Sequence, residues 1–383
     1  MDLFWLRDNT IFLTVHGSQA YGLNHPLSDL DVKGVCIPPA KVRDHLFQGF
    51  EQAENSPDIN QWTYVTPRIN PANAKVESNV YSLRKFFKLA ADVNPNIIEV
   101  LFTDPSDHLI RRPIFESLAA IRDEFLSSKA KFTFTGYAVA QLNKINRHRK
   151  WLVAPVTEKP KREDFGLPSE RPPAVETVAR EIRKLVEEWN FHQYRLDDLE
   201  RSELKERCWE VIYRVAVGKE VDWDNWPDQY WKAAIAKLQE QLNLSNELRA
   251  VVEREHQYQQ AKQTYESYLR WETSRNPERK ALEAKYKYDV KHAMHLVRLL
   301  RMGVEIIETG KVIVKRPDAE ELIHIRNGGW SYEQLVDYAA RMQAHIDTAY
   351  QVTKLPRSVN HVKLNEHYHG ILEAWRTKHG TFV

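Results

Sequence analysis

Two aspartates separated by one residue, Asp29 and Asp31, are the side chains of this sequence best suited to chemistry. Residues 30–37 are predicted to form a β-strand, in which alternate side chains point to the same face. Both carboxylates therefore lie on one face, where they can share divalent cations. A pair of such ions about 3.5–4 Å apart promotes in-line displacement at phosphorus. A lone Asp-x-Asp pattern is common by chance, so neighbouring residues must support this interpretation.

A Gly-Ser pair precedes the aspartates. Gly17 and Ser18 follow residues 11–16, an apolar and β-branched run that is predicted to be a buried strand. Glycine lets the backbone approach a ligand closely, and the serine hydroxyl lies beside exposed backbone amides, so this turn can hold phosphate oxygens. Lys33 shares the strand face of the aspartates and is expected to point toward a triphosphate; a solvated lysine is the alternative.

The stretch HGSQAYGLNHPLSDLDVKGV, residues 16–35, resembles the nucleotidyltransferases of the polymerase-β superfamily, whose signature is a Gly-Ser turn followed by an Asp-x-Asp strand. It looks most similar to a subgroup of nucleotidyltransferases associated with RNA-repair genes. The resemblance continues at scattered points, namely residues 81–86, residues 94–96 with Glu99, residues 136–137 with Gln141, and residues 291–295.

The resemblance implies a metal-dependent reaction. A nucleoside monophosphate would pass from an NTP or dNTP to an acceptor hydroxyl, with release of pyrophosphate. Asp29 and Asp31 would hold two magnesium ions, with manganese as an alternative, and Gly17 and Ser18 would hold the β- and γ-phosphates. The superfamily also needs a third carboxylate, and Glu77 is the candidate. Strand alternation places Glu77 with Asn79 on the face opposite the apolar side chains of residues 76 and 80; an exposed strand glutamate is the alternative.

A helix predicted within residues 286–309 provides a second set of phosphate contacts. Its apolar side chains recur every three or four residues. Lys291, His295 and Arg298 then share an adjacent face and are expected to contact the donor triphosphate. A solvated basic helix face is the alternative.

The acceptor is expected to be nucleic acid, with the 3′ end of an RNA such as tRNA as the first choice. Arg147, Arg149 and Lys150 end a predicted helix just before a proline-rich loop at residues 154–174, and Trp151 can stack on a base. Cations at a helix C-terminus also suit the helix dipole. Two alternatives stay open: nucleotidylation of a protein or small molecule, in the manner of AMPylation, and a non-catalytic nucleotide-binding module.

Composition sets broad limits on location and partners. The formal net charge of +2 neither requires nor excludes nucleic acid. The two cysteines, Cys36 and Cys208, fit a reducing compartment. The sequence has no apparent signal peptide and no apolar run long enough to span a bilayer, so we expect a cytoplasmic protein with no membrane partner. The spacing of His361, His367 and His369 matches no standard zinc motif.

The predicted fold class is α+β, with a small mixed-sheet polymerase-β-like core over residues 1–105 and a large α-helical domain over residues 106–383. Strands are expected at 11–16, 30–37, 61–66 and 74–80, before a helix at 81–92. Apolar residues at helical spacing predict the later helices, at residues 113–127, 129–150, 175–199, 201–217, 226–243, 245–272, 277–309 and 331–353.

Overall fold

The computed structural model describes residues 3–170, except for 26, 27, 46, 48 and 70–74, together with residue 180 and residues 246–275 and 277–379. The chain divides into two compact units. The first comprises residues 1–153 and 277–383, and the second residues 154–276. The helices predicted at 175–199, 201–217 and 226–243, residues 171–174 of the proline-rich loop, and Cys208 lie outside the described residues.

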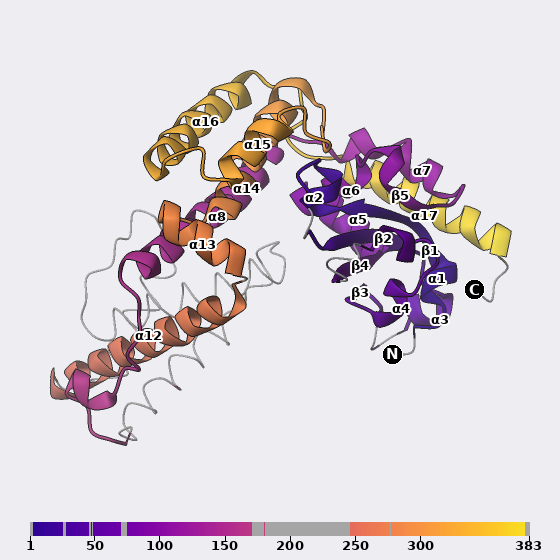
Figure 1. The fold of residues 1–383 in the computed structure, drawn as a ribbon. Helices are drawn as coiled ribbons and strands as arrows, with labels where there is room; N and C mark the ends of the chain where they lie inside the picture. The colour runs from indigo at the N-terminus through magenta and orange to yellow at the C-terminus, as the bar shows by residue number, and fades with distance from the viewer. Residues whose placement is uncertain are drawn as a thin grey trace. The chain divides into compact units, whose positions relative to one another are not determined.

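A five-stranded mixed sheet organises the first unit (Figure 1). Its spatial order is β3-β4-β2-β1-β5. β2 runs antiparallel to β1 and parallel to β4, so the only parallel pair of the sheet is β2 with β4. The strands are β1 (Thr10–His16), β2 (Leu30–Cys36), β3 (Gln52–Glu54), β4 (Val76–Ser82) and β5 (His108–Arg111).

Alternation of apolar side chains along β2 and β4 gives the sheet two buried faces. Leu30, Val32 and Val80 belong to a small core together with Trp62. Val35 and Tyr81 point the other way, into a larger core that the helices of the first unit complete. Because Asp31 shares the parity of Val35, its carboxylate lies on the face of the larger core, at the end where β2 begins.

Short helices surround the sheet, and α5 begins at a side-chain cap. The Ser82 hydroxyl accepts a hydrogen bond from the Lys85 backbone amide, which satisfies one amide of the first turn. The elements around the sheet are α1 (Leu6–Asn9), α2 (Gly17–Ala20), α3 (Ala40–Arg43), α4 (Pro57–Asn60), η1 (Thr66–Arg68), α5 (Leu83–Ala91), α6 (Pro95–Leu101), η2 (Pro105–Asp107), α7 (Phe115–Ala119) and η3 (Arg122–Phe125).

Longer helices complete the first unit. α14 packs against α8, α15 and α16, and its apolar side chains are buried along most of its length. α17 packs against α5 and α7. These helices are α8 (Ala130–Val153), α13 (Pro277–Tyr286), α14 (Val290–Thr309), α15 (Ala319–Arg326), α16 (Tyr332–Val352) and α17 (His361–His379).

In the second unit, the described residues include η4 (Arg162–Phe165) and α12 (Asn246–Ser274). Arg162 joins the two elements through a two-pronged ion pair with Glu255, with distances of 3.0 and 2.7 Å between nitrogen and oxygen atoms. Charge-assisted pairs of this geometry are among the stronger hydrogen bonds. This contact orders part of the segment expected to be a loop at residues 154–174.

The structure confirms the α+β class and corrects several predicted elements. Residues 61–66 form turns instead of a strand, and β3 and β5 were not predicted. The helix expected at 277–309 is two helices, because the backbone turns at Lys287, whose φ is +63°. The predicted boundary between residues 105 and 106 falls inside the first unit, where α8 and α14 share a core with residues of the sheet.

Candidate active site

Asp31 and Glu77 lie side by side on the parallel strands β2 and β4. The register pairs Asp31 with Glu77 and, on the other side, with His16 at the end of β1. Asp29 comes just before β2, at the same end of the sheet. The three acidic side chains predicted from the sequence are therefore close together, although Glu77 reaches this cluster only through the parallel pairing.

The Gly-Ser turn packs directly against this cluster. Gly17 opens α2 with a φ of +64°, a backbone conformation that favours glycine. A Cβ atom placed on Gly17 would lie only 1.9 Å from the Asp31 Oδ2 atom. The Asp31 carboxylate thus occupies the space that any other residue at position 17 would need.

Burial, together with repulsion from neighbouring carboxylates, raises the affinity of Asp31 for a proton. Its pKa is raised to about 6, mainly because the carboxyl is largely buried and then because Asp29 and Glu77 are negatively charged. Lys33 and Lys291 act in the opposite direction and lower this pKa. Lys291 is therefore close enough to act on the acidic cluster although it lies far away in sequence.

A cation already lies between two of the carboxylates. The Lys75 ammonium forms an ion pair with Glu77 and lies 3.7 Å from Asp29 Oδ2. The side chains of Asp29 and Glu77 remain 29% and 48% exposed, so solutes can reach them. The three carboxylates offer the oxygen ligands that hard divalent cations prefer. The raised pKa of Asp31, and the ammonium ion shared by Asp29 and Glu77, are consistent with a cation-binding site.

The side chain of Lys33 is held by a hydrogen bond, whereas the sequence suggested a lysine that points toward a triphosphate. Its ammonium donates a hydrogen bond to the Asn96 side-chain oxygen at 3.2 Å. Burial lowers the pKa of Lys33, whereas the charges of Glu99 and Asp31 raise it. Its ammonium therefore faces α6 as well as the acidic cluster.

The three predicted cations of α14 lie in different environments. Lys291 is exposed, whereas Arg298 is buried and pairs with Glu99, with 2.5 Å between Nη1 and Oε1. The guanidinium of Arg298 also lies over the Tyr21 ring, 3.8 Å from its centroid. Burial holds the pKa of His295 well below its usual value, so this imidazole is neutral near pH 7. Of the three side chains predicted to form a row of cations, only Lys291 is exposed. His295 is neutral, and Arg298 is already paired with Glu99.

Sequence reasoning missed the buried network around Glu99. The Tyr21 hydroxyl donates a hydrogen bond to Glu99, and His16 Nε2 lies 3.4 Å from the same carboxylate. Burial lowers the pKa of His16 to about 4, so this imidazole is neutral at pH 7. Because His16 and Tyr21 flank the Gly-Ser turn, the network connects both ends of that turn to Glu99. The sequence did offer one signal for this network, because Tyr21 and Glu99 both lie in segments that resemble the nucleotidyltransferases.

The three cations at the end of α8 differ in exposure. Arg147 and Lys150 are exposed, and the Arg147 guanidinium lies 5.9 Å from the Trp151 ring centroid. Arg149 lies over the Tyr332 ring at 4.3 Å and is half-buried. Arg147 and Lys150 are therefore the more accessible pair for a ligand.

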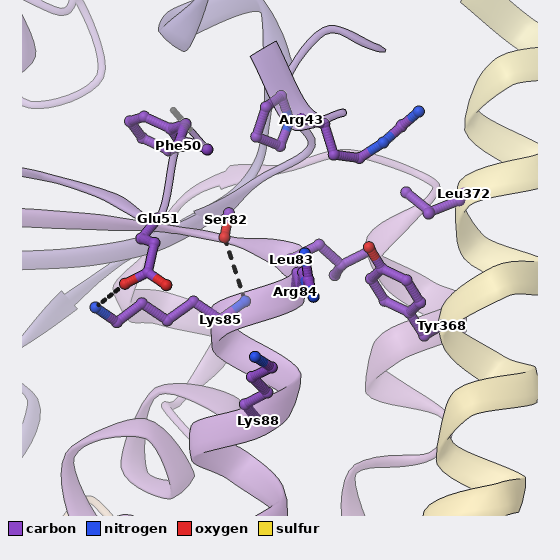
Figure 2. Close-up of a pocket in the computed structure, with 12 residues that line it drawn as sticks. Arg43, Phe50, Glu51, Ser82, Leu83, Arg84, Lys85, Lys88, Tyr368 and Leu372 are labelled. Atoms are coloured by element: carbon purple, nitrogen blue, oxygen red, sulfur yellow. Dashed lines mark hydrogen bonds and ion pairs between the residues drawn. The ribbon is translucent and has the colours of Figure 1, made fainter. Parts of the chain in front are cut away.

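A cavity of about 180 Å³ lies at the opposite end of the parallel strands, beside the start of α5. Figure 2 shows Lys85 directed toward Glu51, and their ion pair has an N–O distance of 2.9 Å. Arg84 and Lys88 also line this cavity, and within the described part of the chain neither forms an ion pair or side-chain hydrogen bond. Two further hollows against α17 share Arg84 and Tyr368 with it. These cations lie away from the acidic cluster.

Comparison with known proteins relates the N-terminal part of the chain to a described family. The model of the family described as "RNA repair pathway DNA polymerase beta family" matches residues 7–154, which include the Gly-Ser turn and all three carboxylates. The matched region is polymerase-β-like, of the nucleotidyltransferase type associated with RNA repair, and the resemblance inferred from the sequence is confirmed. Enzymes of this type usually use divalent metals, with an NTP donor and, in general, a nucleic-acid acceptor.

A viral relative extends the similarity along most of the chain. An uncharacterized 38.9 kDa protein from the nrdC-mobD intergenic region of Enterobacteria phage T4 is 22% identical over 349 residues. The alignment covers 89% of each chain. No solved structure matches this sequence. In the described residues of the structure, no helix is both long and apolar enough to cross a membrane.

Proposed function

We propose that this protein transfers a nucleoside monophosphate from an NTP to the hydroxyl at an RNA 3′ end, such as that of tRNA, and releases pyrophosphate. The observation that carries the proposal is the register of Asp31 with Glu77, beside a Gly17 that leaves no room for a side chain. Acidic side chains gathered at a glycine turn suit the binding of a metal–nucleotide complex. The matched family supports the same reaction class.

Asp29, Asp31 and Glu77 would hold two Mg²⁺ ions. When bound, these ions supply positive charge that stabilises the phosphates as they pass through the transition state. Lys75 bridges Asp29 and Glu77, and it would have to release them for divalent cations to bind there. Glu77 is the most exposed of the three carboxylates and is the group proposed to accept the proton of the attacking hydroxyl.

Gly17 and Ser18 would hold the β- and γ-phosphates of the donor. Lys291 would add a positive charge near Asp31, where negative charge builds up as pyrophosphate leaves. Lys33, held by Asn96, would keep a second positive charge at the same face of the sheet. Arg298 is proposed to act through Glu99 and Tyr21, as a positioning residue for the Gly-Ser turn.

The RNA acceptor is proposed to bind Arg147 and Lys150 on α8. His148, between them, contacts Asp289 at the start of α14, two residues before Lys291. This proximity supports an acceptor path that leads from α8 toward the acidic cluster. The cations around Arg84 lie beyond the other end of β4 and are proposed to take no part in it.

Incubation of the pure protein with each α-labelled NTP and total tRNA, with and without Mg²⁺, tests the proposal. Magnesium-dependent label in RNA is the expected result. Label in protein instead would support the alternative of protein nucleotidylation, and label in neither would favour a non-catalytic nucleotide-binding module. Asp29→Asn and Asp31→Asn variants in parallel show whether the label depends on the acidic cluster.

A further inference from the structure

Two histidines and an aspartate meet where α8 packs against the start of α14, and none of them belongs to the acidic cluster. His148 comes from α8, and Asp289 and His292 come from the N-terminal turn of α14. One ligand atom from each residue lies within 4.8 Å of the other two. Among the described residues, this is the one group of three histidine, cysteine or acidic side chains that is so closely gathered.

The two oxygens of Asp289 have different roles. Oδ1 accepts a hydrogen bond from the His292 backbone amide at 3.0 Å and thereby caps α14. Oδ2 faces both imidazoles, at 2.9 Å from His148 Nδ1 and 3.6 Å from His292 Nε2. The cap therefore fixes the carboxylate so that its second oxygen points between the two rings.

The spacing and burial suit a small metal ion. Ligand atoms about 2.0–2.1 Å from a tetrahedral metal lie about 3.3 Å from one another, and the observed distances of 2.9 and 3.6 Å lie on either side of that value. The Asp289 side chain is fully buried, and buried charges in proteins are commonly paired or bound to metals. The His292 side chain is 19% exposed, which leaves a path for an ion and a solvent ligand.

We propose that His148, Asp289 and His292 bind one divalent transition-metal ion, with Zn²⁺ as the best match to their donors. Two imidazoles and one carboxylate suit zinc, whereas Mg²⁺ prefers oxygen ligands, so this site is distinct in kind from the acidic cluster. The ion binds Nδ1 of the neutral His148 imidazole, whose single N–H proton then lies on Nε2, and any displaced proton passes to solvent. The ion links α8 to the turn of α14 that carries Lys291. The proposal does not depend on nucleotidyl transfer.

Zinc binding by the full, tag-free chain tests the proposal directly. After removal of metals with a chelator, the protein is loaded with Zn²⁺, and bound zinc is measured by mass spectrometry after gel filtration. Cobalt loading gives a second readout, the visible absorption of a four-coordinate ion. We expect one zinc per chain, an affinity about 100-fold or more lower in His148→Ala and in His292→Ala, and no displacement of zinc by excess Mg²⁺.

Two control variants separate this site from others in the chain. Asp29→Asn/Asp31→Asn removes charge from the acidic cluster, and His367→Ala/His369→Ala removes the C-terminal histidines. Both should keep the zinc, and circular dichroism shows whether each variant is folded. The proposal is overturned if the wild-type chain binds no zinc, if folded His148→Ala and His292→Ala bind as tightly as wild type, or if the zinc is lost with either control.

Discussion

The backbone of Gly17 lies so close to the carboxylate of Asp31 that an added Cβ would come within 1.9 Å of Oδ2. The contact joins the two halves of the sequence motif, because Gly17 directly follows β1 and Asp31 lies on β2. A methyl group at position 17 must therefore move the carboxylate or the turn. In either case, the turn that is expected to hold the donor phosphates shifts relative to Asp31, which is expected to bind a metal ion.

Gly17→Ala should consequently abolish transfer, with at least a 100-fold loss, which corresponds to about 2.7 kcal/mol of barrier. Gly22→Ala is a matched control, because Gly22 also has a positive φ, +73°, but its Cβ would meet its nearest neighbour at 3.9 Å. Both variants should lose about 1–2 kcal/mol of stability from backbone strain. Comparable turnover in the two variants would show that the contact with Asp31 is unimportant.

Asp31→Asn should stabilise the metal-free protein at neutral pH while removing activity. The pKa of Asp31 is raised from 3.8 to about 6 in the folded state, so the folded chain binds more protons than the unfolded chain between these values. The free energy of unfolding therefore falls as pH rises through this window. Removing the charge should recover about 1–3 kcal/mol at pH 8 and little at pH 3.5.

Denaturant unfolding in chelator, at pH 3.5 and pH 8, measures this difference. Added Mg²⁺ or Mn²⁺ should stabilise the wild-type chain at pH 8 more than Asp31→Asn, since the cation relieves the same repulsion. If Asp31→Asn is no more stable than wild type at pH 8, burial and repulsion destabilise the Asp31 carboxylate less than the structure indicates.

Arg298→Met should unfold the protein more readily, because it leaves the buried Glu99 carboxylate without its guanidinium. Loss of one partner of a buried pair costs about 3–5 kcal/mol. Arg301→Met, on the same helix, is the control, since Arg301 pairs with the partly exposed Asp318 and Glu321 and should cost less. The double variant Glu99→Gln/Arg298→Met should recover part of the loss. A higher KM for NTP with unchanged stability would instead indicate that Arg298 contacts the triphosphate.

RNA affinity should depend on α8 and not on the cavity beside α5. Each lost phosphate contact lowers the slope of log affinity against log salt by about 0.7–0.9. Arg147→Gln/Lys150→Gln should therefore weaken binding and flatten the slope by about 1.5, and Arg84→Gln/Lys88→Gln should change neither. Arg149 is left in place because it packs on Tyr332. If the Arg84/Lys88 variant shows the larger effect, the acceptor path runs past α5 instead.

The sequence was sufficient for features governed by local periodicity. The two-residue repeat of β2 and β4 places Asp31 and Glu77 on the face opposite Val32 and Val80, as predicted. Contacts between residues far apart in the sequence could not be predicted in this way. Arg298 has the same helical spacing from Lys291 whether it faces solvent or Glu99, and that partner lies 199 residues away. The break at Lys287 also escapes prediction, because both flanking helices carry apolar residues at helical spacing.

The central claim is nucleotidyl transfer at the acidic cluster, and a pair of differently labelled donors tests it most directly. With Mg²⁺ and RNA, label at the α-phosphate of the NTP should enter RNA, and label at the γ-phosphate should appear only in pyrophosphate. Asp29→Asn and Asp31→Asn, verified as folded, should each reduce the α-label in RNA by at least 100-fold. Transfer of the γ-label to an acceptor, or α-label incorporation by both variants within a factor of about three of wild type, which is under 1 kcal/mol of barrier, would contradict the account.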